Sequence, residues 1–140
     1  MHRLRACAAL VLTVLCVCIA PTASRGASLA RPSPKLAWVF DTHRDKDDTP
    51  ISNVLLVVNG RRIVVARDLV DRFTVVERRE FKDRDFPSKA LIACAGWYAG
   101  GGDDYYVTRR GRRLYVYNRG VDESDKERQP FTLVKIIRRW

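Results

Sequence analysis

A tight β-hairpin is the strongest structural signal in this 140-residue sequence. In NVLLVVNGRRIVVAR (53–67), two runs rich in β-branched residues flank the pair Asn59-Gly60. Asn-Gly is the preferred central pair of a two-residue type I′ turn, because both positions require a positive φ. The segment therefore predicts two antiparallel strands joined at Asn59-Gly60, in a chain built mainly from β-sheet.

Strand-like runs recur along the rest of the chain, with no long amphipathic helix between them. They cover residues 35–41, 72–81, 90–99, 131–140 and a second hairpin over 104–118, in which Gly111 supplies the turn. The segment RDLVD (67–71) is expected to form a short helical turn. Short strands at this spacing predict an all-β domain of about seven antiparallel strands, either a small meander barrel or a two-sheet sandwich.

The first thirty residues have the layout of a secretory signal peptide. A basic start, MHRLR, precedes an apolar run without a charge (6–20), and small residues follow in PTASRGASLA (21–30). The apolar run is shorter than the ~20 residues that a membrane-spanning helix needs. We therefore expect residues 1–30 to be a signal peptide that is cleaved somewhere in 23–30. Residues 31–140 would then form a single secreted or periplasmic β domain without a transmembrane segment.

Removal of this segment would leave one cysteine. Cys7, Cys16 and Cys18 lie in the first thirty residues, and Cys94 is the only cysteine of the predicted domain. A single cysteine cannot form an internal disulfide, which excludes a disulfide-stapled secreted miniprotein. Free cysteine behaves as a small hydrophobe, and ALIACAGW is an apolar strand-like run, so we expect Cys94 to be buried. The alternatives are a reactive thiol and an intermolecular one.

The predicted domain is basic. Three of the 26 basic residues and none of the 16 acidic residues lie in the first thirty positions, so 23 basic and 16 acidic residues leave a net charge of +7. Such a charge favours anionic partners. The arginine pairs are, however, interspersed with acidic clusters such as DKDD and DESDKE, and a solvated surface of mixed sign accounts for this pattern without any ligand.

The stretch CAGWYAGGGDDYY (94–106) predicts a corner between two strands. Its three glycines permit a positive φ and a close backbone approach. Asp103 and Asp104 are expected to cap the turn through their carboxylates. Tyr105 and Tyr106 must point to opposite faces of a strand, so one is expected in the core and the other outside. Trp97 is expected to pack against one of these tyrosines beneath the corner.

The candidate binding residues lie in this stretch and in the hairpin that follows it. Basic residues interleaved with aromatic ones on a small β domain are typical of single-strand nucleic-acid binders, but alternating aromatics in a hairpin are also ordinary core and cross-strand pairs. An exported protein rarely meets nucleic acid, which disfavours that partner. We expect a non-catalytic binding or cell-envelope protein with an anionic or protein partner. The candidate residues are Trp97, Tyr98, Asp103, Asp104, Tyr105, Arg109, Arg110, Arg112 and Arg113.

Two other functions stay open at this point. One is a hydrolytic enzyme that uses carboxylates near the turn at 100–104, drawn from Asp103, Asp122 and Glu123. The other is a polyanion or nucleic-acid-binding module that uses the arginine pairs and the hairpin tyrosines. No catalytic residue, metal ligand or cofactor is assigned. GGGDD lacks the spacing of a dinucleotide site, DTHRDKDD lacks the order of a calcium loop, and one cysteine with His43 is too little for zinc.

The segment ACAGWYAGGGDDYYVTRRGRRLYVYNRGVDE, with FPSKAL before it, resembles a group of small exported bacterial proteins. These carry an A-C-x-x-W-x-A-G-x-G-D stretch, then an aromatic-rich hairpin and a D-E pair. Where many of these proteins have a second tryptophan, this chain has Tyr98. The resemblance implies an exported β domain and no particular activity. The matching positions are Ala93, Cys94, Trp97, Ala99, Gly100, Gly102, Asp103, Asp122 and Glu123.

Overall fold

β-Strands make up nearly all of the regular structure in the computed structural model, which describes residues 32–124 and 128–140. The predicted signal peptide, residues 1–30, lies outside the described residues. No helix in the two described ranges is long and apolar enough to cross a membrane.

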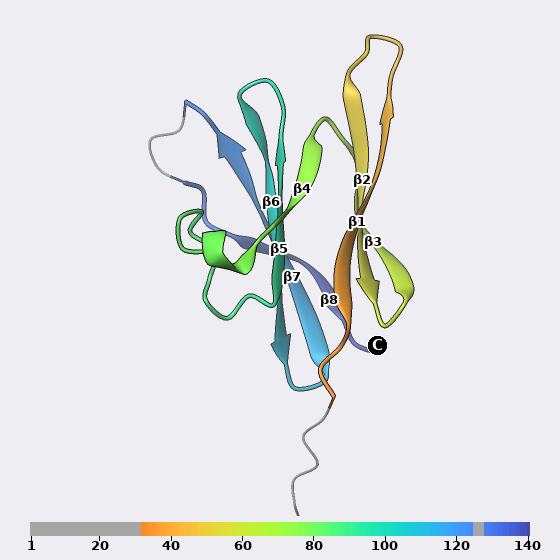
Figure 1. The fold of residues 1–140 in the computed structure, drawn as a ribbon, viewed down its shortest axis with the longest axis vertical. Helices are drawn as coiled ribbons and strands as arrows, with labels where there is room; N and C mark the ends of the chain where they lie inside the picture. Colours follow the sequence, from red (N-terminus) through yellow and green to blue (C-terminus); the bar gives the residue numbers. More distant parts are fainter. Residues whose placement is uncertain (1–31, 125–127) are drawn as a thin grey trace, which may run out of the picture. The chain divides into compact units, whose positions relative to one another are not determined.

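Two antiparallel sheets form the fold (Figure 1). The first contains β1 (Leu36–Arg44), β2 (Pro50–Val58) and β3 (Arg61–Leu69). The second contains β4 (Arg72–Val76), β5 (Ile92–Trp97), β6 (Gly101–Arg110), β7 (Arg113–Asp122) and β8 (Thr132–Ile137). Each sheet follows the sequence order of its strands, so both are meanders. The prediction of an all-β domain is confirmed as a two-sheet sandwich, and the described residues form eight strands where about seven were expected.

The predicted hairpin turns are present. Asn59 has a φ of 50° and Gly60 a φ of 85°, which is the positive pair that a type I′ turn requires. The amide of Lys35 donates a hydrogen bond of 2.9 Å to Asn59 Oδ1, so the asparagine also holds the chain that enters β1. Gly111, in the turn between β6 and β7, has a φ of 58°. The turns thus follow directly from local residue preferences.

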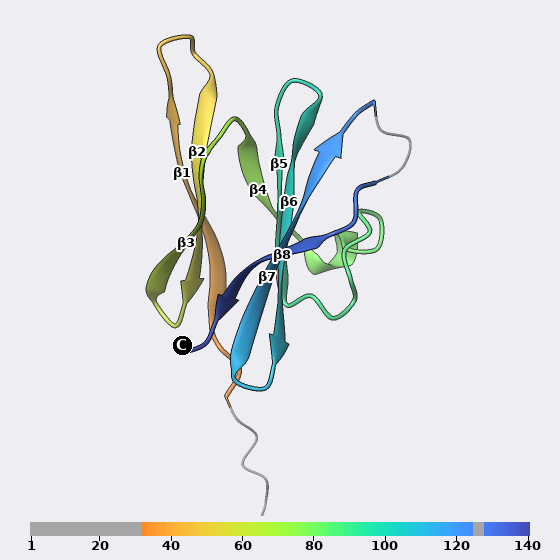
Figure 2. The ribbon, with the colours of Figure 1, turned by 180° about the vertical axis from the view of Figure 1, so that it is seen from behind.

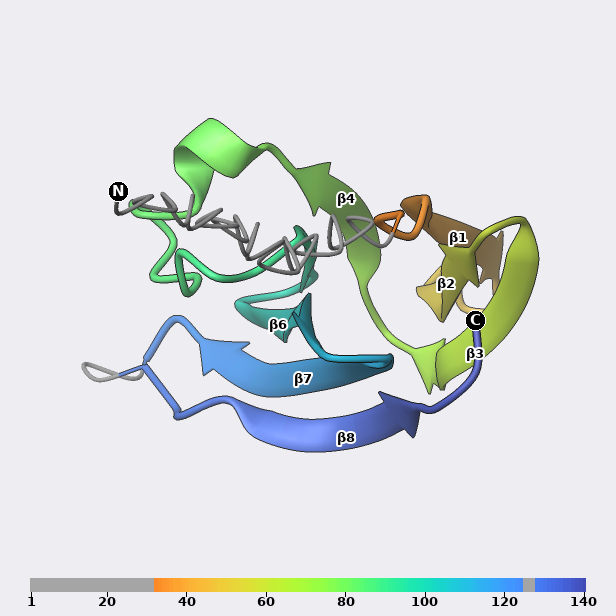
Figure 3. The ribbon, with the colours of Figure 1, turned by 90° about the horizontal axis from the view of Figure 1, so that it is seen from below.

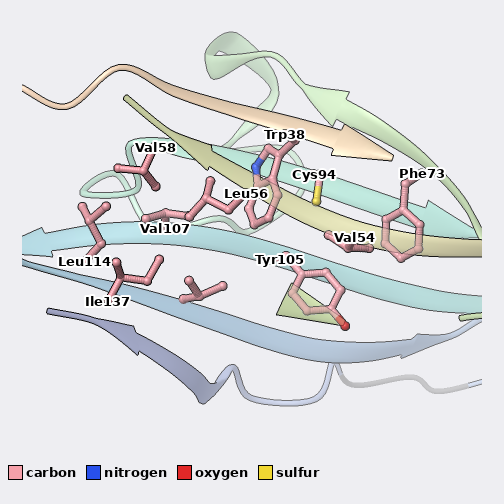
Figure 4. Packing of buried hydrophobic residues seen from close by; sticks show 11 residues of the cluster. Trp38, Val54, Leu56, Val58, Phe73, Cys94, Tyr105, Val107, Leu114 and Ile137 are labelled. Carbon is pink, nitrogen blue, oxygen red and sulfur yellow. The ribbon is translucent and has the colours of Figure 1, made fainter. Parts of the chain in front are cut away.

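An apolar core fills the space between the sheets, where side chains from both point toward one another (Figure 4). Every second residue of β2, from Pro50 to Val58, is buried, because successive side chains of a strand alternate between its faces. Each fully buried valine or leucine contributes about 1.5–3 kcal/mol to stability. Cys94 belongs to this core and is fully buried, which confirms the expected burial. The core residues are Trp38, Val54, Leu56, Val58, Phe73, Cys94, Tyr105, Val107, Leu114, Val116 and Ile137.

The opposite face of the five-stranded sheet is covered as well. A short 3-10 helix, η1 (Arg78–Glu80), and the loop after it lie on the side of this sheet away from β1–β3 (Figures 1 and 3). Phe81 and Phe86 of this segment pack with Tyr106 in a second apolar cluster. Both Tyr105 and Tyr106 are therefore buried, one on each face. The expectation that one tyrosine faces outward is wrong, because the loop after β4 folds back over that face.

Two local predictions are also wrong. RDLVD forms no helical turn, since β3 continues to Leu69 and the chain then passes through a bend at Val70 and Asp71 into the other sheet. The strand predicted over 72–81 ends at Val76, because the following residues leave the sheet to cover its outer face. At the far end of the chain β8 ends beside β3 (Figure 2), where Lys135 Nζ donates a hydrogen bond of 2.7 Å to the carbonyl of Val64.

The corner between β5 and β6 needs glycine, as predicted. Its central residues, Ala99 and Gly100, have φ values of 51° and 90°. Gly102 requires glycine for a different reason: a Cβ at this position would overlap the carbonyl oxygen of Gly96 on the neighbouring strand. The strands approach so closely here that only a residue without a side chain fits.

We therefore expect Gly102→Ala to lower the free energy of unfolding by about 1–3 kcal/mol or more, since overpacking forces backbone shifts. Gly120→Ala is the matched control, because nothing lies within 4 Å of a Cβ built on this glycine of β7. It should melt like the parent or slightly above it. Thermal unfolding followed by circular dichroism measures both. Equal melting temperatures for Gly102→Ala and the parent would contradict the close approach.

Candidate functional site

The residues that the sequence suggested for binding lie at opposite ends of the five-stranded sheet. Trp97 and Asp103 flank the β5–β6 corner, whereas Arg109 and Arg113 flank the β6–β7 turn. A strand advances about 3.4 Å per residue, so the two ends of β6 are roughly 30 Å apart. These residues do not form one site.

Two of the four hairpin arginines, Arg109 and Arg110, contact aromatic rings of the same chain. The guanidinium carbon of Arg109 lies 5.1 Å from the ring centroid of Trp140, and its Nε donates a hydrogen bond of 2.9 Å to the carbonyl of Gly111. The guanidinium carbon of Arg110 lies 5.5 Å from the ring centroid of Tyr115. Such cation–π contacts stabilise the end of the sandwich. Arg112 and Arg113 are exposed.

Asp104 does not cap the turn, as had been expected, but forms a buried ion pair. Its Oδ2 accepts hydrogen bonds from Arg119 Nε at 3.0 Å and Nη2 at 2.9 Å. Arg119 Nη2 also donates to the carbonyl of Arg84 at 2.7 Å, which ties the loop after η1 to β7. Burial raises the pKa of Asp104, and the hydrogen bond from Arg119 and its charge oppose that shift. The expectation failed because the cross-strand partner of Asp104 in β7 is Arg119.

Asp103 does not cap the turn either, because its carboxylate is bound by a residue of β7. Its Oδ1 accepts a hydrogen bond of 2.8 Å from Asn118 Nδ2 on β7. It also lies beside Asp71, a residue that sequence reasoning missed because it is a lone acidic residue between two strands. Burial, the charge of Asp103 and a hydrogen bond with its side chain raise the pKa of Asp71 to about 6. Burial and the same Asp103 charge also raise the pKa of Tyr105.

Trp97 does not pack beneath the corner, contrary to expectation. It is 45% exposed, whereas Tyr105 lies in the core on the other face of the sheet. The alternation along β5 explains this, because Cys94 faces the core between the sheets and Trp97, three residues later, points to the opposite face. A large exposed aromatic side chain at a strand end is a feature of binding surfaces.

Trp97 borders a hollow of about 490 Å³. Arg72 of β4 is the register partner of Trp97 on β5, so their Cβ atoms are about 4.5–5.5 Å apart. Arg84 from the loop after η1 and Arg128 from the segment before β8 also line the hollow. We call this the arginine hollow; its lining residues are Arg72, Thr74, Arg84, Ala95, Gly96, Trp97, Asp104, Val121 and Arg128.

The charges around the arginine hollow do not cancel. Arg84 pairs with Glu80 at 3.4 Å, and Arg128 pairs with Asp85 at 3.0 Å. Asp104 is paired with Arg119. Arg72 forms no ion pair with any residue in the described part of the chain. Counted over the described residues, the hollow therefore carries an excess of one positive charge beside an exposed indole ring.

A second hollow, of about 530 Å³, lies at the glycine corner. It is lined by Tyr98, Ala99, Gly100, Gly101, Asp122, Glu123 and Ser124. Asp122 accepts hydrogen bonds from the amide and hydroxyl of Ser124, which lower its pKa. Of the three carboxylates considered for hydrolysis, Asp122 and Glu123 line this hollow together, whereas Asp103 is not among its lining residues. Within residues 32–124 and 128–140, no three His, Cys, Asp or Glu side chains are grouped so that they could hold a metal ion.

Sequence reasoning missed three of the arginines that matter here. Arg72, Arg84 and Arg128 come from three separate segments and belong to none of the arginine pairs. No spacing pattern links them, so the sequence carried no signal for the hollow. Comparison of the chain with protein-family models, with curated proteins and with solved structures found no match.

The raised pKa of Asp71 predicts a pH dependence of stability. Between about pH 4 and pH 6 the folded protein retains a proton that the unfolded chain has released, so stability falls as the pH rises through this window. Below about pH 4 both states are protonated, and the loss disappears. Asp71→Asn should remove this dependence and stabilise the protein at pH 7 by about 1–3 kcal/mol.

Denaturant unfolding at a series of pH values measures the effect. Asp41→Asn, at an exposed aspartate of β1, is the control and should keep the pH profile of the parent. An unchanged profile in Asp71→Asn would show that Asp71 does not titrate in this window.

Proposed function

We propose that this chain is an exported, non-catalytic binding domain whose anionic ligand docks in the arginine hollow. The observation that carries the proposal is the convergence of Arg72, Arg84 and Arg128 around the exposed ring of Trp97. The volume of the hollow, about 490 Å³, lies within the range of about 300–1,000 Å³ that small-molecule sites occupy.

The chemistry of arginine supports an anion as ligand. A guanidinium group is planar and presents its donors as a fork that matches a carboxylate or a phosphate. Arg72 has no acidic partner among the described residues, so binding an anion there breaks no existing ion pair. Arg84 and Arg128 are held at the wall by Glu80 and Asp85 and add further donors.

In the arginine hollow, binding is favoured over hydrolysis because the carboxyl groups nearest to it are engaged elsewhere. Asp104 borders the hollow, but its Oδ2 is held by Arg119. Asp71 and Asp103 interact with each other and line neither of the two hollows described above. A general acid must reach the substrate, and neither of these side chains borders the hollow in which the ligand is proposed to dock.

A polyanion or nucleic-acid module fits less well. Single-strand binders stack bases on exposed rings, but Tyr105 and Tyr106 are buried, and Arg110 lies over the ring of Tyr115. The hairpin arginines are also far from Trp97 along β6. A small anion in the arginine hollow is therefore the better proposal.

The export part of the proposal rests on the layout of residues 1–30. Fused to a reporter that is active only outside the cytoplasm, these residues should give a signal. Mass spectrometry of the exported protein should find its first residue between Ser24 and Arg31. An exported protein that retains Met1 would contradict cleavage, and an inactive reporter would contradict export.

Binding is tested by NMR titration of the isotope-labelled protein with acetate and with inorganic phosphate at an ionic strength of about 0.1 M. Signals of Thr74, Ala95 and the indole N–H of Trp97 should shift. Arg72→Gln should weaken binding about tenfold, because a hydrogen bond to a charged group is worth about 1.5–3 kcal/mol.

Arg110→Gln is the matched control. It also removes one positive charge, but at the last residue of β6, whereas the hollow lies near the first residues of that strand. It should leave the affinity within about twofold of the parent, since charges farther apart than about 10 Å are largely screened at 0.1 M salt. Equal weakening by both substitutions, or no shift around the hollow with either anion, would refute the proposed site.

A further inference from the structure

We infer that the ligand of the arginine hollow is an acidic sugar, meaning a pyranose ring that carries a single carboxylate. This inference rests on the proposed function and narrows it to one class of anion. It follows from three features of the hollow: its net charge, the neighbouring positions of Arg72 and Trp97, and its free hydrogen-bond acceptors.

The net charge favours a ligand with one negative group. Among the described residues, Arg84, Arg128 and Asp104 each have an ion-pair partner, and Arg72 has none. One carboxylate neutralises the remaining positive charge. A further negative group would meet only arginines whose charge is already balanced by Glu80 or Asp85, so a polyanion gains less here than on a continuous basic surface.

The positions of Arg72 and Trp97 favour a ring attached directly to the carboxylate. The two residues are cross-strand partners on β4 and β5, and both line the hollow. A carboxylate bound to the Arg72 guanidinium therefore places its substituent over or beside the indole. The face of an aromatic ring is electron-rich and attracts polarised C–H groups, such as those on one face of a pyranose. Acetate has no group that reaches this surface.

The remaining polar atoms favour hydroxyl groups on that ring. Asp104 uses Oδ2 for Arg119, and its Oδ1 has no hydrogen-bond partner within the described residues. The hydroxyl of Thr74, an exposed residue that also lines the hollow, has no hydrogen-bond partner among the described residues either. A sugar hydroxyl can donate to each of these oxygens, whereas an aromatic carboxylate would leave both without a donor. Ala95 contributes only a methyl group to the lining and Gly96 no side chain at all, which leaves space for the ring.

The test compares four probes by NMR titration of the whole purified protein: glucuronate, glucose, acetate and benzoate. Glucuronate should bind at least tenfold more tightly than acetate and benzoate, and glucose should not bind in the same concentration range. Trp97→Ala should remove the advantage of glucuronate, so that glucuronate and acetate bind this variant with similar affinity. Arg72→Gln should weaken both.

Trp97 is 45% exposed, so its removal leaves the core intact, and an unchanged melting temperature would verify this. Equal affinity for acetate and glucuronate would overturn the inference but leave anion binding in place. Tighter binding of benzoate would assign an aromatic carboxylate instead. If none of the three anions shifts the signals of the hollow, the proposed function fails together with the inference.

Discussion

The buried ion pair between Asp104 and Arg119 connects the parts of the structure on which the candidate site depends. It joins β6 to β7 on the outer face of the five-stranded sheet, and Arg119 also holds the carbonyl of Arg84 in the loop after η1. Removing one partner of a buried ion pair commonly costs about 3–5 kcal/mol, because the other charge is left without a partner. The same contact keeps Arg84 at the wall of the arginine hollow. Loss of this ion pair would therefore affect both the stability of the fold and the position of Arg84 in the proposed binding site.

The five-stranded sheet is covered on both faces, and this explains the distribution of its aromatic residues. Tyr105 faces the three-stranded sheet, and Tyr106 faces Phe81 and Phe86 of the loop that folds back over the outer face. The cover is incomplete near the β5–β6 corner, where Trp97 stays exposed. The hollow lies at this point, so its position follows from where the loop stops covering the sheet.

The neighbouring aspartates Asp103 and Asp104 lie on opposite faces of β6 and have different partners. Asp104 points to the outer face and pairs with Arg119, while its neighbour Asp103 contacts Asn118 and Asp71. Two carboxyl groups in contact disfavour simultaneous ionisation, and burial strengthens this effect. The sandwich therefore contains a destabilising carboxyl pair beside the corner. On the opposite face, Arg119 offsets part of the cost of burying the Asp104 carboxylate. Neither role was visible in the sequence, where both residues were predicted to cap the turn.

The sequence alone determined the features that depend on neighbouring residues. Asn59-Gly60 specified its turn, the β-branched runs specified strands, and the apolar run around Cys94 indicated its burial, because each depends on local conformational preference or on the period of a strand. Only the tertiary structure decided which segment, if any, covers each face of the strands. The loop after η1 buried Tyr106, the alternation of β5 left Trp97 exposed, and the packing of three distant segments brought Arg72, Arg84 and Arg128 together. Contacts between distant segments leave no periodic signal in a single sequence, so the residues of the hollow could be identified only in the folded chain.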